Sequence, residues 1–197
     1  MCIAYVDEMA RLVLLNGPPA SGKSTLATRL VRTRPMALNL DIDLIRGQLG
    51  AWTDSPADAG VVARRLAIAM AATHLGDGHD VVVPQFLARP EFIVDLAGTA
   101  RRVGADFVEI ALIVTRTETI DAFAGRSARP DNQQHRDAHA LVERSGGVAA
   151  LGEMYDRYIE LLDTRPNATR IEARRGDVEG TLRAIEKILA TVPRTPV

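Results

Sequence analysis

Several residue types are scarce in this sequence. Cys2 is the only cysteine, which excludes an internal disulfide and a zinc site built from several thiolates, and which fits a reducing compartment. Aromatic residues make up only 4% of the chain, so few side chains are available for stacking on nucleic-acid bases. No apolar run approaches the roughly 20 residues of a membrane-spanning helix. The sequence therefore indicates neither a membrane span nor a general nucleic-acid-coating protein.

The charge is nearly balanced, with 24 Lys and Arg against 25 Asp and Glu. A net charge of −1 provides no basic field for nonspecific nucleic-acid binding. Asp7 and Glu8 stand near the N-terminus, where a secretory signal peptide would be basic. We therefore expect a cytoplasmic protein and, at 197 residues, a single domain over 1–197. Both a monomer and a homodimer are compatible with these features.

Lysine is rare, occurring only as Lys23 and Lys187, while arginine supplies the other basic residues. Lys23 lies in a G-x-x-x-x-G-K-[ST] pattern between an apolar run at 11–16 and a segment of helical spacing at 24–31. In such a loop the backbone N–H groups converge on phosphate oxygens. We expect ATP or another NTP to bind here, with Lys23 at its β- and γ-phosphates and Ser24 as a ligand of Mg²⁺. The predicted loop comprises Gly17, Pro18, Pro19, Ala20, Ser21, Gly22, Lys23, Ser24 and Thr25.

Short apolar runs alternate with segments of helical periodicity. The runs cover 11–16, 36–40, 80–84, 106–114 and 169–173, and the helical segments cover 24–31, 44–49, 56–75, 90–103, 148–162 and 177–192. This alternation predicts an α/β protein with a five-stranded parallel sheet and helices on both faces. In the helix over 56–75 we expect Arg64 and Arg65 to face outward. The expected inward face consists of Val61, Val62, Leu66, Ile68 and Met70.

A polar cluster, Asp41-Ile42-Asp43-Leu44-Ile45-Arg46, follows the second run. Because ligands gather at the carboxyl ends of parallel strands, these side chains should share a crevice with the glycine loop. Asp43 could accept the proton of a hydroxyl that attacks the γ-phosphate, and Arg46 could steady the acceptor or the transferred group. Asp41 is a candidate substrate-binding or outer-sphere Mg²⁺ residue. The alternative for Asp43 is that it only caps the next helix.

The stretch over 115–147 is polar and has little apolar periodicity, so we predict a mobile segment outside the core. His135 and His139 fall within it, and His74 and His79 lie elsewhere. None of the four histidines has a convincing metal-ligand pattern.

The chain resembles the small P-loop kinases of the AAA_33 group, which includes enzymes like chloramphenicol phosphotransferase and the kinase domain of polynucleotide kinase. The resemblance rests on LVLLNGPPASGKST (12–25), the D-x-x-R step from Asp43 to Arg46, and the stretch from Thr117 to Arg129. It implies a P-loop NTPase fold with a helical lid over 115–147. It also implies that Asp43 activates the acceptor and that Arg126 and Arg129 are lid arginines. The alternative for both arginines is a solvated helix surface.

The third run ends in Val83-Pro84-Gln85-Phe86, where many P-loop enzymes carry an aspartate. Gln85 is therefore a candidate contact for the acceptor, and Trp52 and Phe86 could line its pocket. Together these features predict a phosphotransferase that moves the γ-phosphate of ATP to a hydroxyl of a small molecule such as an antibiotic, a sugar or a nucleoside. The alternatives are a nucleic-acid end kinase, which the low charge disfavours, and a non-catalytic nucleotide-dependent switch or partner-binding domain.

Overall fold

A parallel sheet forms the centre of the protein, in a computed structural model that describes residues 9–19, 21–128 and 133–192 apart from the side chain of residue 134. Its order is β2-β3-β1-β4-β5, and every neighbouring pair is parallel, as predicted. The strands are β1 (Arg11–Asn16), β2 (Leu38–Asn39), β3 (Val81–Gln85), β4 (Asp106–Ile113) and β5 (Thr169–Glu172). β2 is shorter than the predicted 36–40, and the other four strands agree closely with the sequence.

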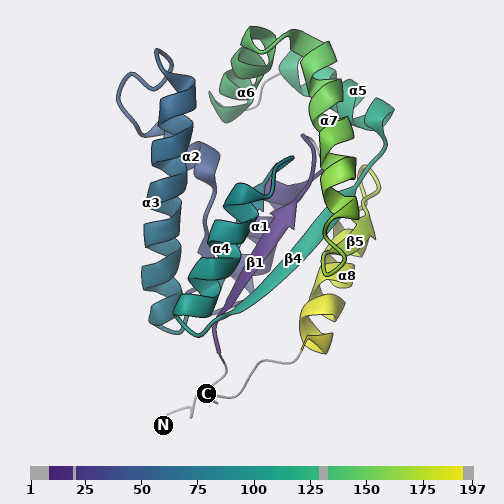
Figure 1. Ribbon diagram of the computed structural model, residues 1–197. Helices are drawn as coiled ribbons and strands as arrows, with labels where there is room; N and C mark the ends of the chain where they lie inside the picture. The colour runs from purple at the N-terminus through teal and green to yellow at the C-terminus, as the bar shows by residue number, and fades with distance from the viewer. Residues whose placement is uncertain (1–8, 20, 129–132, 193–197) are drawn as a thin grey trace.

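Helices cover both faces of the sheet (Figure 1). They are α1 (Lys23–Arg32), α2 (Ile42–Gly47), α3 (Pro56–Gly76), α4 (Glu91–Arg102), α5 (Arg116–Ala128), α6 (Gln133–Arg144), α7 (Gly147–Asp163) and α8 (Val178–Thr191). Leu12 and Leu14 of β1 pack with α3 and α4, whereas Val13 and Leu15 pack with α1 and α8. β1 is therefore buried on both faces, which explains its unbroken apolar sequence.

Across the described ranges, none of the helices is both long enough and apolar enough to cross a membrane.

The inward face of α3 differs from the prediction. Its buried residues are alanines at every fourth position, with Leu75 at the end: Ala59, Ala63, Ala67, Ala71 and Leu75. The large apolar side chains Val61, Val62, Leu66 and Met70 are exposed, and Ile68 is half-buried. Because alanine has a small side chain, α3 can pack closely against α2 and α4 along this face. The prediction was wrong because it ranked residues by hydrophobicity and overlooked the i, i+4 repeat of alanine.

The segment 115–147 is helical where the structure describes it. Thr115 and Glu118 form a capping box at the start of α5: the Thr115 backbone N–H donates to Glu118 Oε2 (2.9 Å), and the Glu118 backbone N–H donates to Thr115 Oγ1 (3.2 Å). Phe123 and Thr119 are buried, so α5 also contributes to packing, contrary to the expectation that this segment lies outside the core. α6 lies above the carboxyl edge of the sheet in Figure 1. Where the structure describes it, this segment therefore consists of the two helices α5 and α6.

Candidate active site

The glycine loop connects β1 to α1, as the motif requires. Gly22 has φ 86°, a left-handed conformation that favours glycine, and it stands at the N-terminus of α1. A Cβ on Gly17 would lie 2.7 Å from Ser21 Oγ and 3.0 Å from Leu112 Cβ, so a side chain there would force Ser21 to shift. Ser21 Oγ is buried and has no hydrogen-bond partner within the described residues. This orphaned hydroxyl inside a glycine cradle at a helix N-terminus fits a phosphate group. Ala20 lies outside the described residues.

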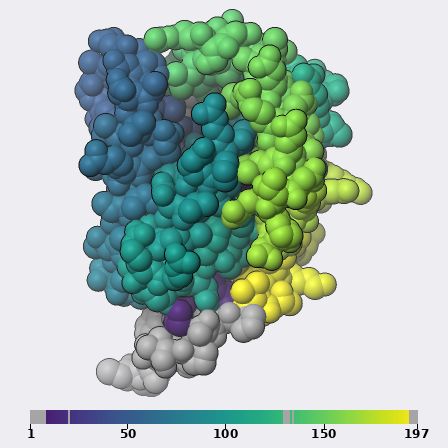
Figure 2. All heavy atoms as spheres, in the orientation of Figure 1, coloured from purple at the N-terminus to yellow at the C-terminus, as the bar shows by residue number. Residues whose placement is uncertain are grey.

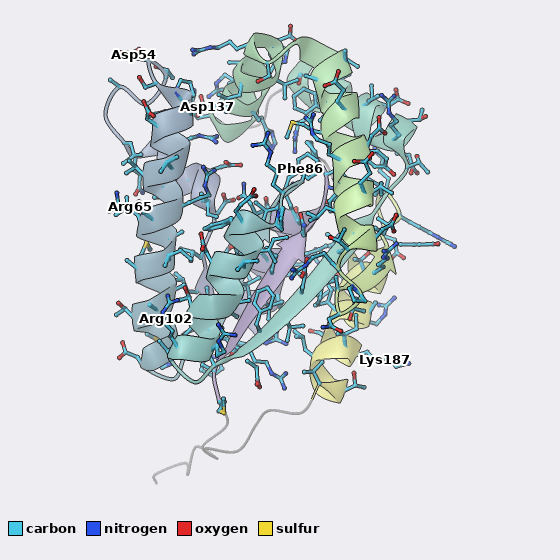
Figure 3. The ribbon with its side chains drawn as sticks, viewed as in Figure 1. Asp54, Arg65, Phe86, Arg102, Asp137 and Lys187 are labelled. Carbon is cyan, nitrogen blue, oxygen red and sulfur yellow. The ribbon has the colours of Figure 1, made fainter. Side chains whose placement is uncertain are left out.

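Lys23 is the first residue of α1, and its Nζ donates to the carbonyl oxygen of Pro18 (3.3 Å). Burial is the main cause that lowers the pKa of Lys23 from 10.5 to about 8. The positive charge of Arg126 lowers it further, while Asp43 and Asp41 act in the opposite direction. Lys23 is therefore a partly buried ammonium that is influenced by charges from α5, from α2 and from the N-cap of α2. Lys187 stands on the exposed surface of α8, away from this site (Figure 3).

Asp41 caps α2, because its Oδ1 accepts the backbone N–H of Asp43 (3.0 Å). The alternative interpretation of Asp43 as the helix cap is therefore wrong. Burial first, and the charge of Asp43 second, raise the pKa of Asp41. Asp43 itself lies in the first turn and is paired with Arg46, whose Nη1 is 3.0 Å from Asp43 Oδ1. The guanidinium of Arg46 lies over the ring of Trp52 at 5.0 Å, so Asp43 is held by a cation that is itself packed in place.

Arg126 lies on α5 and acts electrostatically on Lys23 of the glycine loop. Arg126 is partly buried and lies over the ring of Phe123 at 5.8 Å. Its positive charge lowers the pKa of Lys23, so the two cations interact electrostatically. At the other end of the lid, Arg144 Nη1 donates to the carbonyl oxygen of Thr53 (2.8 Å), which ties α6 to the loop before α3. Arg129 lies outside the described residues.

Asn16 fixes the loop that follows β3. Its Nδ2 donates to the carbonyl oxygen of Leu87 (3.2 Å), and its Oδ1 accepts the Leu87 backbone N–H (2.9 Å). Gln85 accepts the backbone N–H of Gly17 through its carbonyl oxygen (3.2 Å), while its buried side-chain Oε1 has no partner in the described part of the chain. Phe86 packs edge-on against Tyr158 at 5.6 Å. Asn16 was not predicted as a site residue, because a polar residue at the end of a strand does not indicate which distant residue it will bond.

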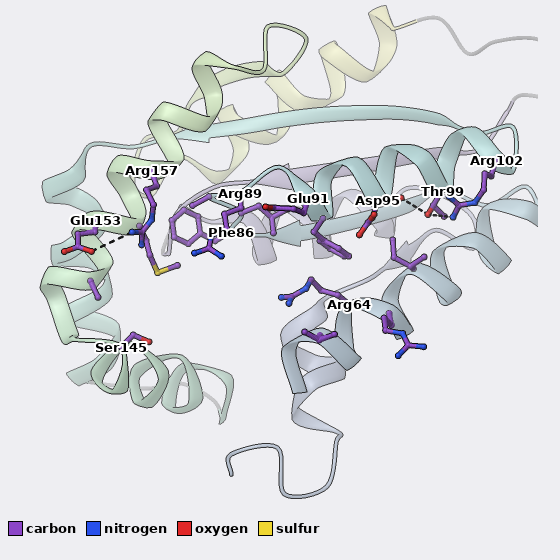
Figure 4. Close-up of a pocket in the computed structure, with 18 residues that line it drawn as sticks. Arg64, Phe86, Arg89, Glu91, Asp95, Thr99, Arg102, Ser145, Glu153 and Arg157 are labelled. Carbon is purple, nitrogen blue, oxygen red and sulfur yellow. Dashed lines mark hydrogen bonds and ion pairs between the residues drawn. The ribbon is translucent and has the colours of Figure 1, made fainter. Parts of the chain in front are cut away.

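A cavity of about 950 Å³ opens beside this loop, between α3, α4 and α7 (Figures 2 and 4). Phe86 lines it, whereas Trp52, Asp43 and Gln85 do not. Arginines dominate its charged lining: Arg64, Arg65, Arg89, Arg102 and Arg157. The sequence contains no signal for this cavity, because its walls come from three helices and a loop that are distant in the chain.

A second, smaller cavity of about 80 Å³ adjoins the glycine loop. It is lined by Pro19 and Gly22 of the loop, Glu118 and Ala122 of α5, and residues 174–178 after β5. Sequence reasoning missed this cavity as well.

The described residues contain no group of three or more His, Cys, Asp and Glu side chains that could hold a metal ion. Oxygen donors around Lys23 include the exposed Ser24 hydroxyl, which follows it in the chain, and the half-buried carboxylates of Asp41 and Asp43, which act on its pKa. Such oxygens suit Mg²⁺, which commonly keeps several waters and takes other ligands from phosphates. The donor set therefore fits a metal ion that arrives with a nucleotide.

Comparison with known proteins agrees with this geometry. The AAA_33 family model, described as an AAA domain, matches residues 12–145, and no curated protein matches the sequence. The structure is similar to the tunicamycin resistance protein of Deinococcus radiodurans (15% identity over 95% of this chain and 99% of that chain, TM-score 0.60). It is also similar to the APS kinase CysC of Mycobacterium tuberculosis in complex with AMPPNP and APS (16% identity, 93% and 99%, TM-score 0.59).

A third similar structure is a chain of the Pnkp1/Rnl/Hen1 RNA repair complex (14% identity over 90% of this chain and 52% of that chain, TM-score 0.66). At these identities the solved structures establish the α/β P-loop fold. The match over residues 12–145 includes most of β1, the glycine loop, α2 and both lid helices, which is more than half of the chain. On that match, this chain belongs to the AAA_33 family.

Proposed function

We propose that this protein transfers the γ-phosphate of ATP to a hydroxyl group of a small molecule. The family and the P-loop kinase fold support a nucleotide-dependent phosphotransferase. The observation that carries the finer proposal is the electrostatic grouping of Lys23, Asp43 and Arg126, which lie close enough to shift the pKa of Lys23. A cation for the phosphates, a carboxylate for the acceptor and a lid cation are the parts that phosphoryl transfer needs.

The nucleotide-binding role rests on the loop. Backbone N–H groups of the loop and the ammonium of Lys23 would bind the phosphates, and the second cavity beside Pro19 would take the base or sugar. Ser24 would hold Mg²⁺, which when bound neutralises charge on the β- and γ-phosphates. Ser21 Oγ, buried and unpartnered among the described residues, would donate to a phosphate oxygen.

Asp43 would accept the hydroxyl proton of the acceptor. In the step, a bond forms between the acceptor oxygen and the γ-phosphorus, the bond to the β-phosphate oxygen breaks, and ADP leaves. The proton moves to an Asp43 oxygen that Arg46 orients at 3.0 Å. Arg126 would add positive charge where negative charge spreads over the γ-phosphate oxygens.

The test is a search for a phosphorylated product. The protein is incubated with Mg-ATP and a pool of hydroxyl compounds, and mass spectrometry is used to find a compound that gains one phosphoryl group. We expect such a product with the wild type and with the control Asp77→Asn, which lies at the end of α3 away from the loop, but not with Asp43→Asn. If ATP binds and no compound is phosphorylated, the non-catalytic switch or binding domain becomes the better interpretation.

A further inference from the structure

The large cavity has an unusual charge for this protein. Its lining includes five arginines and three acidic residues, Glu91, Asp95 and Glu153, whereas the whole chain carries a net charge of −1. Arginine remains protonated at every physiological pH, so this excess is permanent. The local charge is thus opposite in sign to that of the whole molecule, which indicates a preference for negatively charged ligands.

The five arginines differ in their partners. Arg157 is 3.8 Å from Glu153, and Arg102 donates to Thr99 Oγ1 (2.8 Å). Arg64, Arg65 and Arg89 have no ion pair or hydrogen bond from their side chains to any residue that the structure describes. Three guanidinium groups in or beside the cavity are therefore available to a ligand.

Two of these three approach the interior of the cavity. Arg64 Nη1 lies 3.6 Å from the position of a Cβ on Gly60, one helical turn toward the N-terminus of α3. That end of α3 is at the carboxyl edge of the sheet (Figure 1), so the guanidinium is directed toward the edge that holds the phosphate loop. Figure 4 shows Arg64 reaching into the space between α3 and α4, and Arg89 beside Phe86.

We propose that the acceptor carries an anionic group, such as a phosphate or sulfate ester or a carboxylate, that is separate from the reacting hydroxyl. Arg64 and Arg89 bind this group, because the planar guanidinium pairs with two oxygens at once. Phe86 offers an apolar surface next to them, and Glu91 and Asp95 accept hydrogen bonds from further hydroxyls of the acceptor. This inference rests on the proposed function, since it names the substrate class of the same site.

The cavity is also connected to the phosphate loop. The hydrogen bonds between Asn16 and Leu87 join the last residue of β1 to the cavity wall, and Gly17 follows directly. A ligand anchored on Arg89 and Phe86 is therefore held next to the loop by a rigid backbone link. The anionic group then orients the acceptor, and the hydroxyl extends toward Asp43.

Arginine footprinting tests binding without turnover. Mg-AMPPNP first fills the nucleotide site, and phenylglyoxal then modifies the arginines in the presence of inorganic phosphate, glycerol 3-phosphate, glycerate or neutral glycerol. We expect the anionic probes to slow the modification of Arg64 and Arg89, and glycerol to have no effect. Arg101, which is exposed on α4 outside the cavity, is the internal control. If no anionic probe protects Arg64 and Arg89 more than it protects Arg101, the proposal is wrong.

Paired acceptors test the consequence for catalysis. Phosphoryl transfer is measured to glycerol, glycerate and glycerol 3-phosphate, and to uridine and its 5′-monophosphate. We expect transfer to an anionic member, and we expect Arg64→Gln and Arg89→Gln each to raise its KM about 10- to 100-fold with the KM for ATP unchanged. Arg101→Gln should change neither value. Comparison of the phosphate esters with glycerate identifies which anionic group the site prefers.

The two proposals can fail separately. If the protein phosphorylates neutral compounds and the Arg64 and Arg89 variants leave their KM values unchanged, the proposed anionic acceptor is wrong. The proposed kinase activity would still hold. Protection of both arginines without any transfer would keep the anion site and contradict the kinase. Arg64 and Arg89 are exposed, so melting temperatures of their variants should match the wild type.

Discussion

Lys23 illustrates how a single residue acquires its properties from its surroundings. Burial and the nearby Arg126 lower its pKa to about 8, although Asp43 and Asp41 counteract this effect. In the absence of nucleotide, about half of the lysine is thus neutral near pH 8. A bound triphosphate brings negative charge to the same position and favours the ammonium form. Nucleotide binding and protonation of Lys23 are therefore coupled.

This coupling predicts that ATP binding takes up a proton at mildly alkaline pH. Because the free protein loses the Lys23 proton above about pH 8, ATP affinity should fall as the pH rises from 7.5 to 10. Lys23→Ala should bind ATP weakly at every pH in this range and take up no proton. Calorimetry in buffers of different ionisation enthalpy measures the uptake, and an affinity of the wild type that is independent of pH would contradict the assignment.

Asp41 and Asp43 are two residues apart and have separable roles. We expect Asp43→Asn to lower kcat about 10²- to 10⁴-fold with little change in ATP affinity or melting temperature, because the lost group is a proton acceptor and not the cap. Asp41→Ala should instead destabilise the protein by roughly 0.5–2 kcal/mol, and Asp41→Asn, which keeps a capping oxygen, should be milder. Thermal unfolding and steady-state kinetics on the three variants distinguish these roles. If instead the Asp41 variants lowered kcat and Asp43→Asn lowered only stability, Asp41 would be the catalytic residue.

At the scale of elements, α3 is held by its small residues. Ala67 is fully buried, whereas the neighbouring Leu66 is 43% exposed. Ala67→Leu should overpack the contact and destabilise the protein by about 1–3 kcal/mol. Leu66→Ala removes a larger side chain, yet it should change stability by no more than about 0.5 kcal/mol because the side chain is not packed in the core. Urea unfolding of the two variants measures both changes in stability. A larger loss of stability for Leu66→Ala than for Ala67→Leu would mean that Leu66 faces the core, as the sequence analysis predicted.

The lid helices also differ in how firmly they are held. α5 has the buried Phe123 and a capping box, whereas α6 has no fully buried residue among those described and is tied at its end by the bond from Arg144 to Thr53. We expect amides of α6 to exchange faster than those of α5 without nucleotide, and to slow with a non-hydrolysable ATP analogue and acceptor. Arg144→Ala should speed exchange in α6 further. Unchanged exchange on ligand binding would mean that α6 is a fixed wall of the site.

The charge of Arg126 on α5 can be tested by its effect on catalysis. Arg126→Ala should lower kcat with a smaller effect on ATP affinity, since its charge is needed most where the γ-phosphate oxygens gain negative charge. Arg136 on α6 is exposed and provides a matched control. A wild-type kcat for Arg126→Ala would leave Arg46 as the candidate for the transition-state cation.

At the scale of the whole molecule, the parallel sheet gathers the site at one edge. The strand order places β1 between β3 and β4, so the glycine loop after β1 lies next to the loop after β3. Asn16 joins these two loops through both of its side-chain polar atoms. The glycine loop and the wall of the large cavity are therefore parts of one rigid unit.

The architecture and the phosphate loop could be determined from the sequence by itself. An apolar strand, a glycine-rich turn and a helix are local patterns, and parallel pairing follows from strands that are apolar on both faces. The capping box of α5 was a local signal of the same kind, present in the sequence and overlooked. Local signals suffice where residues close in the chain set the backbone conformation.

Only the tertiary structure decided which side chains meet. The alanine face of α3 depends on how closely α2 and α4 approach, and the hydrogen bonds from Asn16 to Leu87 join residues 71 positions apart. Arg126 acts electrostatically on Lys23 from a separate helix. The cavity arginines come from α3, α4, α7 and a loop, so their common charge exists only once the chain has folded. Packing distances and electrostatic fields depend on positions in space, and separation along the chain does not specify them.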